Sequence, residues 1–263
     1  MAYINVNDIK VYYEIHGQGE PLLLIHGLGS STLDWEYQLD FLKAKYQVLI
    51  FDLRGHGKTD KPNTPYSVAM FAADTASLIR SQFPQGMHIF GHSLGGMIAF
   101  QLAVDAPELV KTLTVLNSAP AVIFPSVKHH LMFFLRTYHI KIFGMHAMSV
   151  QLSKMLFPEP AQELFRQKFV ERWSQNDPKA YIHSLRAFRG WTVMHRLHSI
   201  ICPKLMIAAD QDYTPVSFKE YYTRLIPNAE LAVIKRSRHI SIVDQAEVFN
   251  NVLSDFLERQ RLK

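Results

Sequence analysis

Residues 87–104 have the sequence MHIFGHSLGGMIAFQLAV, and no other stretch of the chain constrains its architecture as tightly. The first four residues form a short apolar run typical of a buried strand, and the last nine have the composition of a helix. Between them lies the pattern Gly-x-Ser-x-Gly, centred on Ser93. A strand that turns straight into a helix needs a tight turn, where glycines avoid collisions. We therefore predict that Ser93 is a nucleophile at the tip of this turn; an ordinary glycine-rich turn is the alternative.

Further apolar runs of strand length lie on both sides of this stretch. Strands that are apolar on both faces belong in a mostly parallel sheet that helices cover on each side. Segments with apolar residues at helical spacing separate the runs, as at residues 68–79 and 249–257. The chain is thus predicted to have an α/β fold with a mostly parallel central sheet flanked by helices, preceded by a hairpin at residues 3–16. The expected core strands are residues 21–25, 46–51, 87–90, 111–117, 204–209 and 231–234.

The alternation of strands and helices stops between residues 120 and 197. This segment is helical in character and rich in Phe, Met, His and Tyr, with proline-containing breaks at residues 157–160 and 176–178. We expect an inserted helical cap at residues 120–197, and a core made of residues 1–119 and 198–263.

Apolar side chains of the cap are candidates for substrate contact. Leu131 to Leu135 form an apolar run that is expected to pack on the core or to line a pocket. The cap is therefore predicted to act as a lid over an apolar substrate. Trp35, Trp173 and Trp191 are expected to pack in the interior, with substrate contact as the alternative for a tryptophan of the cap.

The 263 residues have the composition of a globular protein, with 48% hydrophobic and 19% charged residues. The single cysteine, Cys202, excludes an internal disulfide, which fits a reducing compartment. The N-terminus lacks the features of a signal peptide, and no apolar run approaches the roughly 20 residues that cross a membrane. We expect a cytoplasmic protein without stable membrane insertion.

The formal net charge of +5 comes from scattered Lys and Arg, apart from short clusters at residues 235–238 and 259–263. A nucleic-acid-binding protein would show a basic stripe on a recognised fold, so we expect a small-molecule substrate instead. No Cys and His cluster has metal-ligand spacing, and no glycine-rich loop resembles a phosphate site. We expect neither a metal nor a cofactor, and the oligomeric state stays open.

A nucleophilic serine needs a base, and the base needs an acid that orients it. His239 lies in the loop after the last expected strand, where active sites of α/β proteins are built. Asp210 and Asp212 both follow the strand at residues 204–209, and the spacing alone leaves both open as the acid. Thr214 is expected to cap the next helix, which would free Asp212 for the triad. The order serine, aspartate, histidine is that of α/β-hydrolases.

Four segments together resemble the α/β-hydrolase superfamily, especially its small serine esterases, lactonases and cofactor-free haloperoxidase-like members. They are His26-Gly27-Leu28-Gly29, Asp52-Leu53-Arg54-Gly55-His56-Gly57, Gly91-His92-Ser93-Leu94-Gly95-Gly96 and Asp210-Gln211-Asp212-Tyr213-Thr214-Pro215. The resemblance spans residues 3 to 260 and is least specific in the cap. It implies that Asp212, rather than Asp210, is the acid of the triad.

A tetrahedral intermediate also needs backbone donors for its oxyanion. Leu94, directly after the nucleophile, offers one N–H at a helix N-terminus. By resemblance, the second donor is the N–H of Leu28, in a loop that His26 is expected to pin. Three further polar residues in the segment at 52–57 are interpreted as a hydrogen-bonded turn that braces the rim of the site. They are Asp52, Arg54 and His56.

The leading hypothesis is a serine hydrolase that cleaves a carboxylic ester or lactone through an acyl-enzyme on Ser93. A carbon–carbon bond hydrolase is a near alternative, although relatives of that type often have tryptophan where this chain has Ile240. A ligand-binding protein on a hydrolase scaffold, with little turnover, is the alternative from another class.

Overall fold

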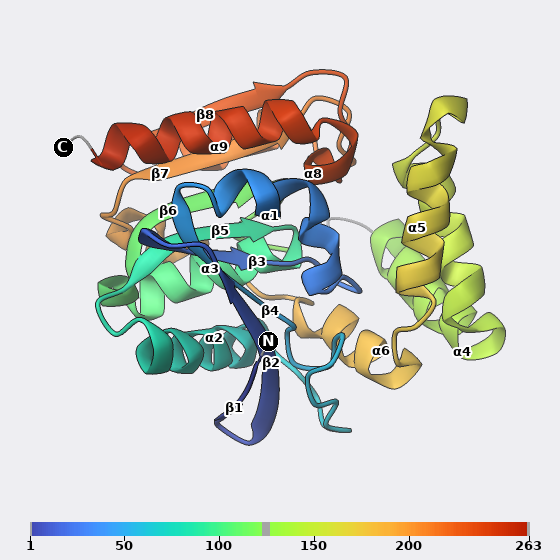
Figure 1. The fold of residues 1–263 in the computed structure, drawn as a ribbon. Helices are drawn as coiled ribbons and strands as arrows, with labels where there is room; N and C mark the ends of the chain where they lie inside the picture. The colour runs from blue at the N-terminus through green and yellow to red at the C-terminus, as the bar shows by residue number, and fades with distance from the viewer. Residues whose placement is uncertain (1, 123–126, 262–263) are drawn as a thin grey trace.

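The predicted sheet is present, and its strands follow the order β1-β2-β4-β3-β5-β6-β7-β8 (Figure 1). The structure, a computed structural model, describes residues 2–122 and 127–261, without the side chains of residues 127–130 and 132. The strands are β1 (Ala2–Val6), β2 (Ile9–His16), β3 (Glu20–Ile25), β4 (Tyr46–Phe51), β5 (Met87–His92), β6 (Val110–Leu116), β7 (Lys204–Ala209) and β8 (Ala229–Ile234). β1 and β2 form the expected hairpin, β2 pairs antiparallel with β4, and the other neighbours are parallel.

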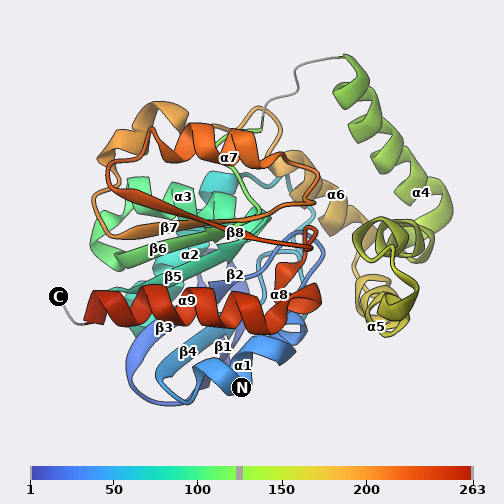
Figure 2. The same cartoon turned by 90° about the horizontal axis from the view of Figure 1, so that it is seen from above.

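Helices cover both faces of this sheet. They are α1 (Glu36–Leu42), α2 (Val68–Gln82), α3 (Leu94–Asp105), α7 (Val216–Thr223), α8 (Ser241–Asp244) and α9 (Ala246–Arg261). In β3, Leu22 and Leu24 pack with residues of α1 and α9, whereas Leu23 and Ile25 pack with residues of α2 and α3. Figure 2 shows α7 and α9 on opposite sides of the strands. Alternate side chains thus enter two separate cores, which explains why the strand is apolar throughout and confirms the predicted α/β class.

The segment between β6 and β7 is helical and lies at one end of the sheet (Figures 1 and 2). It contains α4 (Val127–Leu156), α5 (Glu163–Trp173) and α6 (Pro178–Ala187), so both expected breaks are present. The remaining elements within the described residues are the 3-10 helices η1 (Thr32–Trp35), η2 (Pro107–Leu109), η3 (Pro160–Gln162) and η4 (Met194–Ser199). Within residues 2–122 and 127–261, no helix is both long and apolar enough to cross a membrane.

The apolar run at the start of α4 differs from its prediction. Leu131, Phe134 and Leu135 are each more than half exposed, while Phe133 packs against the larger core cluster. The side chain of Met132 lies outside the described residues. Five consecutive residues occupy more than one full turn of a helix, so they cannot all face the body of the protein. The expectation that this run packs on the core or lines a pocket is therefore wrong for the three exposed residues.

Candidate active site

Ser93 occupies a strained turn between β5 and α3, as the sequence predicts. Its φ of 55° and ψ of −116° lie where residues other than glycine are rare. A Cβ atom on Gly91 would lie 2.3 Å from the Gly95 oxygen, and one on Gly95 would lie 2.0 Å from the Ile25 oxygen. The backbone N–H of Ser93 donates to the Leu116 oxygen at 3.0 Å, which ties the turn to β6. The turn therefore requires glycine at both positions.

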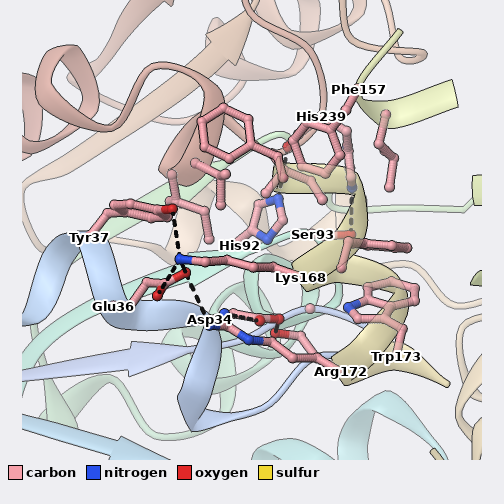
Figure 3. Close-up of a pocket in the computed structure, with 18 of the residues that line it drawn as sticks. Asp34, Glu36, Tyr37, His92, Ser93, Phe157, Lys168, Arg172, Trp173 and His239 are labelled. Carbon is pink, nitrogen blue, oxygen red and sulfur yellow. Dashed lines mark hydrogen bonds and ion pairs between the residues drawn. The ribbon is translucent and has the colours of Figure 1, made fainter. Parts of the chain in front are cut away.

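His239 and Asp212 complete a hydrogen-bonded chain with Ser93. Nε2 of His239 lies 2.9 Å from Ser93 Oγ (Figure 3), and Nδ1 lies 2.8 Å from Asp212 Oδ1. Asp210, the competing carboxylate, instead accepts a hydrogen bond from the backbone N–H of Ser237 at 3.3 Å. When Nδ1–H points to the carboxylate, Nε2 presents its lone pair to the serine hydroxyl. The structure thus brings Asp212, rather than Asp210, to the histidine, in the geometry that a general base requires.

The carboxylate of Asp212 has a second set of contacts that the sequence reasoning missed. The side chain is fully buried, and Oδ2 accepts hydrogen bonds from Lys219 Nζ at 2.6 Å and from the Thr214 hydroxyl. Burial disfavours the charged form, but His239 and Lys219 outweigh burial and hold the pKa of Asp212 below its ordinary value. Burial lowers the pKa of Lys219, and Asp212 opposes that shift. No local sequence pattern marks a lysine of α7 as buried.

Thr214 does not have the role predicted for it. The residue before α7 is Pro215, and no side chain caps this helix. The Thr214 hydroxyl donates to Asp212 instead. Asp212 contacts His239 through Oδ1, while Thr214 and Lys219 bind Oδ2. The predicted helix cap by Thr214 therefore plays no part in freeing Asp212.

Tyr213 contacts the other side of the His239 ring, which the sequence did not single out. Its hydroxyl lies 2.8 Å from Nε2, and the centres of the two rings are 4.3 Å apart. The tyrosine as a whole is 62% exposed, while burial raises the pKa of its hydroxyl, which contacts His239. A neutral imidazole offers one lone pair at Nε2. The hydroxyls of Tyr213 and Ser93 therefore compete for the same acceptor.

Two more residues that the sequence reasoning missed hold the backbone of His239. Nε2 of His92 lies 2.9 Å from the His239 carbonyl oxygen (Figure 3), and Asn117 Nδ2 donates to the same oxygen at 3.0 Å. Burial lowers the pKa of His92 to about 3, so this ring is neutral and donates from Nε2. The side-chain oxygen of Asn117 accepts from the Ala209 N–H at 2.8 Å, which links the loop to the end of β7. Only the tertiary fold brings these groups together.

The two backbone donors predicted for the oxyanion lie beside the serine turn. Leu94 begins α3, and Leu28 lines the same pocket as Ser93. Within the described residues, neither N–H has a hydrogen-bond acceptor. Nδ1 of His26 lies 2.8 Å from the Gly27 oxygen, and its Nε2 accepts from a backbone N–H at 3.0 Å. His26 thus pins the loop that carries Leu28, as predicted.

The polar residues after β4 brace this edge of the molecule, as interpreted from the sequence. Asp52 accepts hydrogen bonds from the backbone N–H groups of Thr32 and Lys58, both at 2.7 Å. Arg54 is buried in an ion pair with Asp74 at 2.8 Å. Burial likewise lowers the pKa of the fully buried His56 to about 3. Their hydrogen bonds connect loops to one another, which is a structural role.

A pocket opens between the sheet and the helices that follow β6. Its empty space is about 620 Å³ when its open mouth is included, and its wall includes Ser93 and His239. Four aromatic residues from the inserted segment form an apolar side: Phe157, Phe165, Phe169 and Trp173. Of the other tryptophans, Trp35 is buried and Trp191 donates to Gln101 at 2.7 Å. The aromatic side is the part of the pocket suited to an apolar group.

Charged residues close one side of this pocket. Lys168 and Arg172 of α5 pair with Glu36 and Asp34 at 3.1 Å each (Figure 3), which ties α5 to η1 and to the first residue of α1. These two cationic and two anionic side chains have no net formal charge together. In the part of the chain that the structure describes, no group of three or more His, Cys, Asp or Glu residues is placed to hold a metal ion.

The sheet order, the strained serine turn after β5 and the helical insertion after β6 define a class of protein. The sequence profile of the alpha/beta hydrolase fold matches residues 20–138. The chain belongs to the α/β-hydrolase superfamily and is a hydrolase enzyme of that superfamily.

Particular relatives extend this similarity over almost the whole chain. A protein of Variovorax paradoxus (strain S110) with the provisional name carbamate hydrolase RutD is 30% identical, over 95% of this chain and 97% of its own. The 3-oxoadipate enol-lactonase 2 of Acinetobacter baylyi is 26% identical, over 97% of this chain and 96% of its own. The crystal structure of a bromoperoxidase from Bacillus anthracis matches with a TM-score of 0.90 and 26% identity, over 98% and 99% of the two chains.

Proposed function

We propose that the protein is a serine hydrolase that cleaves a carboxylic ester or a lactone. His239 takes the proton of Ser93 while Oγ attacks the substrate carbonyl carbon. The N–H groups of Leu28 and Leu94 stabilise the oxyanion of the tetrahedral intermediate. His239 then gives its proton to the leaving alcohol oxygen, and an acyl-enzyme remains on Ser93. A water molecule that His239 deprotonates cleaves the acyl group, which releases the acid and restores the serine.

The observation that carries this proposal is the continuous chain from Ser93 Oγ through His239 to Asp212, with contacts of 2.9 and 2.8 Å. The serine lies in a turn that exposes its hydroxyl to the pocket. The carboxylate orients the ring and stabilises the imidazolium that forms during attack. The lactonase named among the relatives agrees with attack on an ester carbonyl.

The substrate in this proposal carries a hydrophobic group on the side of the aromatic wall formed by Phe157, Phe165, Phe169 and Trp173. We assign residues 120–197 to a cap over the site, and residues 1–119 and 198–263 to the catalytic core. The pocket supports this division, because its catalytic side comes from the sheet and its aromatic side comes from the insertion.

Carbamate hydrolysis is a second candidate, because relatives at 27% to 30% identity have the provisional name carbamate hydrolase. The attack on the carbonyl is the same, but the leaving nitrogen is more basic than an alcohol oxygen. Proton donation from His239 therefore becomes indispensable for the leaving group. Comparing kcat/KM for an ester and for a carbamate of the same overall chain length separates the two candidates.

The test is hydrolysis of p-nitrophenyl esters from acetate to laurate by the wild type and by Ser93→Ala. We expect the rate to fall by about 10⁴-fold or more in the variant, with its thermal unfolding unchanged. The chain length with the highest kcat/KM reports the size of the apolar side of the pocket. Activity retained by Ser93→Ala would refute the proposal. Fluorophosphonate labelling of Ser93 without turnover of any ester or carbamate would favour a carbon–carbon bond hydrolase or a binding protein.

A further inference from the structure

Lys219 of α7 is a buried charged residue that the proposed chemistry does not use. Its side chain is 1% exposed, and its ammonium group has two partners, Asp212 Oδ2 at 2.6 Å and the Thr214 carbonyl oxygen at 2.9 Å. Lysine is almost never buried this completely unless it is paired, because the ammonium group loses its hydration. The chain thus places a desolvated cation directly behind the acid of the catalytic site.

The carboxylate of Asp212 divides its two oxygens between two cationic or potentially cationic groups. Oδ1 contacts Nδ1 of His239, and Oδ2 contacts Lys219. A lone carboxylate at this position would strongly favour protonation of the ring, since opposite charges stabilise each other at short range. Lys219 pairs with that charge at 2.6 Å, so the histidine faces an ion pair rather than an isolated anion.

Other titratable groups lie around this pair, but none contacts the carboxylate as Lys219 does. They are His92, Arg136, Tyr213, Tyr222, Arg238 and Asp244. Burial lowers the pKa of His92 to about 3, so this ring is neutral near pH 7, and it raises the pKa of both tyrosine phenols further above neutral. Arg136 acts on the phenol of Tyr213, and Asp244 accepts from the backbone N–H of Arg238 at 2.9 Å. Among the described residues, Lys219 is thus the one fixed charge bound to the acid.

We propose that Lys219 is a positioning residue that holds the Asp212 carboxylate and offsets its charge, so that His239 stays neutral and able to act as a base at lower pH. This inference rests on the proposed function, because it concerns the same base. A neutral residue at position 219 leaves the carboxylate uncompensated, so the imidazolium gains stability and the base is lost at a higher pH. The acid side of the pH–rate profile therefore depends on the charge of Lys219.

The experiment compares wild type, Lys219→Gln and Lys219→Arg in kcat/KM for one p-nitrophenyl ester between about pH 5 and pH 9. Glutamine keeps an N–H donor for Asp212 but removes the charge, whereas arginine keeps the charge. We expect Lys219→Gln to lose activity at a pH about one unit higher than wild type, so its rate near pH 5.5, relative to its rate near pH 8.5, falls by about tenfold. Lys219→Arg keeps the acid limb of the wild type.

An acid limb in Lys219→Gln at the wild-type position would overturn the inference, and so would equal shifts in both variants. Circular dichroism and thermal unfolding show whether each variant is folded; if Lys219→Gln is not, Lys219→Met, which also lacks the charge, takes its place. If wild type turns over no ester, the rate of fluorophosphonate labelling of Ser93 is followed against pH instead. Labelling needs the same base but no turnover, so failure of the proposed activity and failure of this inference give different results.

Discussion

The turn at Ser93 and the helix α4 are both rich in apolar residues, yet the fold specifies them in different ways. At the turn, a Cβ atom on Gly91 would overlap backbone atoms of Gly95, and one on Gly95 would overlap backbone atoms of Ile25. At Gly144, within α4, a Cβ atom would meet nothing within 4 Å, and Phe134 on the same helix is more than half exposed. Backbone packing therefore excludes side chains at both glycines of the turn, whereas Gly144 and Phe134 face open space even though Met145 and Met148 of the same helix are buried.

This difference separates the groups proposed for chemistry from those proposed for selectivity. Ser93, Asp212 and His239 each follow a strand of the sheet, so their relative positions depend on backbone pairing. The aromatic side of the pocket comes from the insertion after β6. Substitutions in the insertion are thus expected to change which substrate fits, while substitutions beside the turn change whether any reaction occurs.

The largest effect is expected at the acid of the site. Asp212→Asn removes the negative charge and favours the wrong tautomer of His239, so kcat should fall by about 10⁴-fold. Asp210→Asn is the matched control and should retain most of the activity, since the Asp210 carboxylate accepts a hydrogen bond from the backbone N–H of Ser237 at 3.3 Å and not from His239. Steady-state kinetics with one ester measures both, and urea unfolding checks that Asp212→Asn is folded despite the unpaired Lys219. A comparable loss in Asp210→Asn would contradict this assignment.

The next effect tests the contrast in backbone packing directly. In Gly95→Ala the new Cβ atom would lie 2.0 Å from the Ile25 oxygen, so β3 and α3 must move apart. We expect a loss of about 4 kcal/mol or more in the free energy of unfolding. Gly144→Ala has free space around its Cβ atom, but a φ of 76° with a ψ of −179° is a backbone region almost confined to glycine, so we expect a loss of about 1–3 kcal/mol. Equal losses in urea unfolding would show that the two regions are constrained alike.

The same contrast explains what the sequence could and could not predict. Strand positions, the turn at Ser93 and the loop position of His239 follow from periodicity, glycine spacing and chain order, which are local properties. The contacts of Lys219, Tyr213 and Asn117 join residues that are separated in the sequence and meet only in the folded protein, so no local sequence pattern predicts them. The exposure of the run around Phe134 was missed for the same reason, because apolar composition does not say which side of a helix meets the body.

A smaller effect is expected on the free energy of unfolding at acid pH, through His26 in the loop after β3. His26 accepts the Leu53 N–H at Nε2, and burial lowers its pKa to about 4. The unfolded chain binds a proton on this ring below about pH 6.5, so the stability present above that pH is lost as the pH falls toward 4. His26→Gln should reduce the loss of unfolding free energy between about pH 7 and pH 5 by about 2 kcal/mol. His146→Gln, at an exposed position of α4, should lose stability as wild type does, and an equal slope in all three proteins would contradict the prediction.

The smallest effect is expected at Tyr213. This residue lies in the loop after β7, outside the helical insertion, yet it is as exposed as Phe134 of α4. Its hydroxyl and that of Ser93 lie 2.8 and 2.9 Å from the same nitrogen of His239, which can accept one well-directed hydrogen bond. A net hydrogen bond is worth about 1 kcal/mol, so Tyr213→Phe should speed fluorophosphonate labelling of Ser93 and raise kcat/KM by about threefold to fivefold. Tyr221→Phe, on the exposed side of α7, should change neither.

The direction of this change distinguishes two roles for the phenol. A competitor for the base slows every substrate, so its removal should help p-nitrophenyl and alkyl esters equally. A phenol that donates to the leaving oxygen would matter most for alkyl esters, because an alkoxide leaves with more difficulty than p-nitrophenolate. A loss in Tyr213→Phe confined to alkyl esters would therefore contradict competition and place the phenol in the reaction itself.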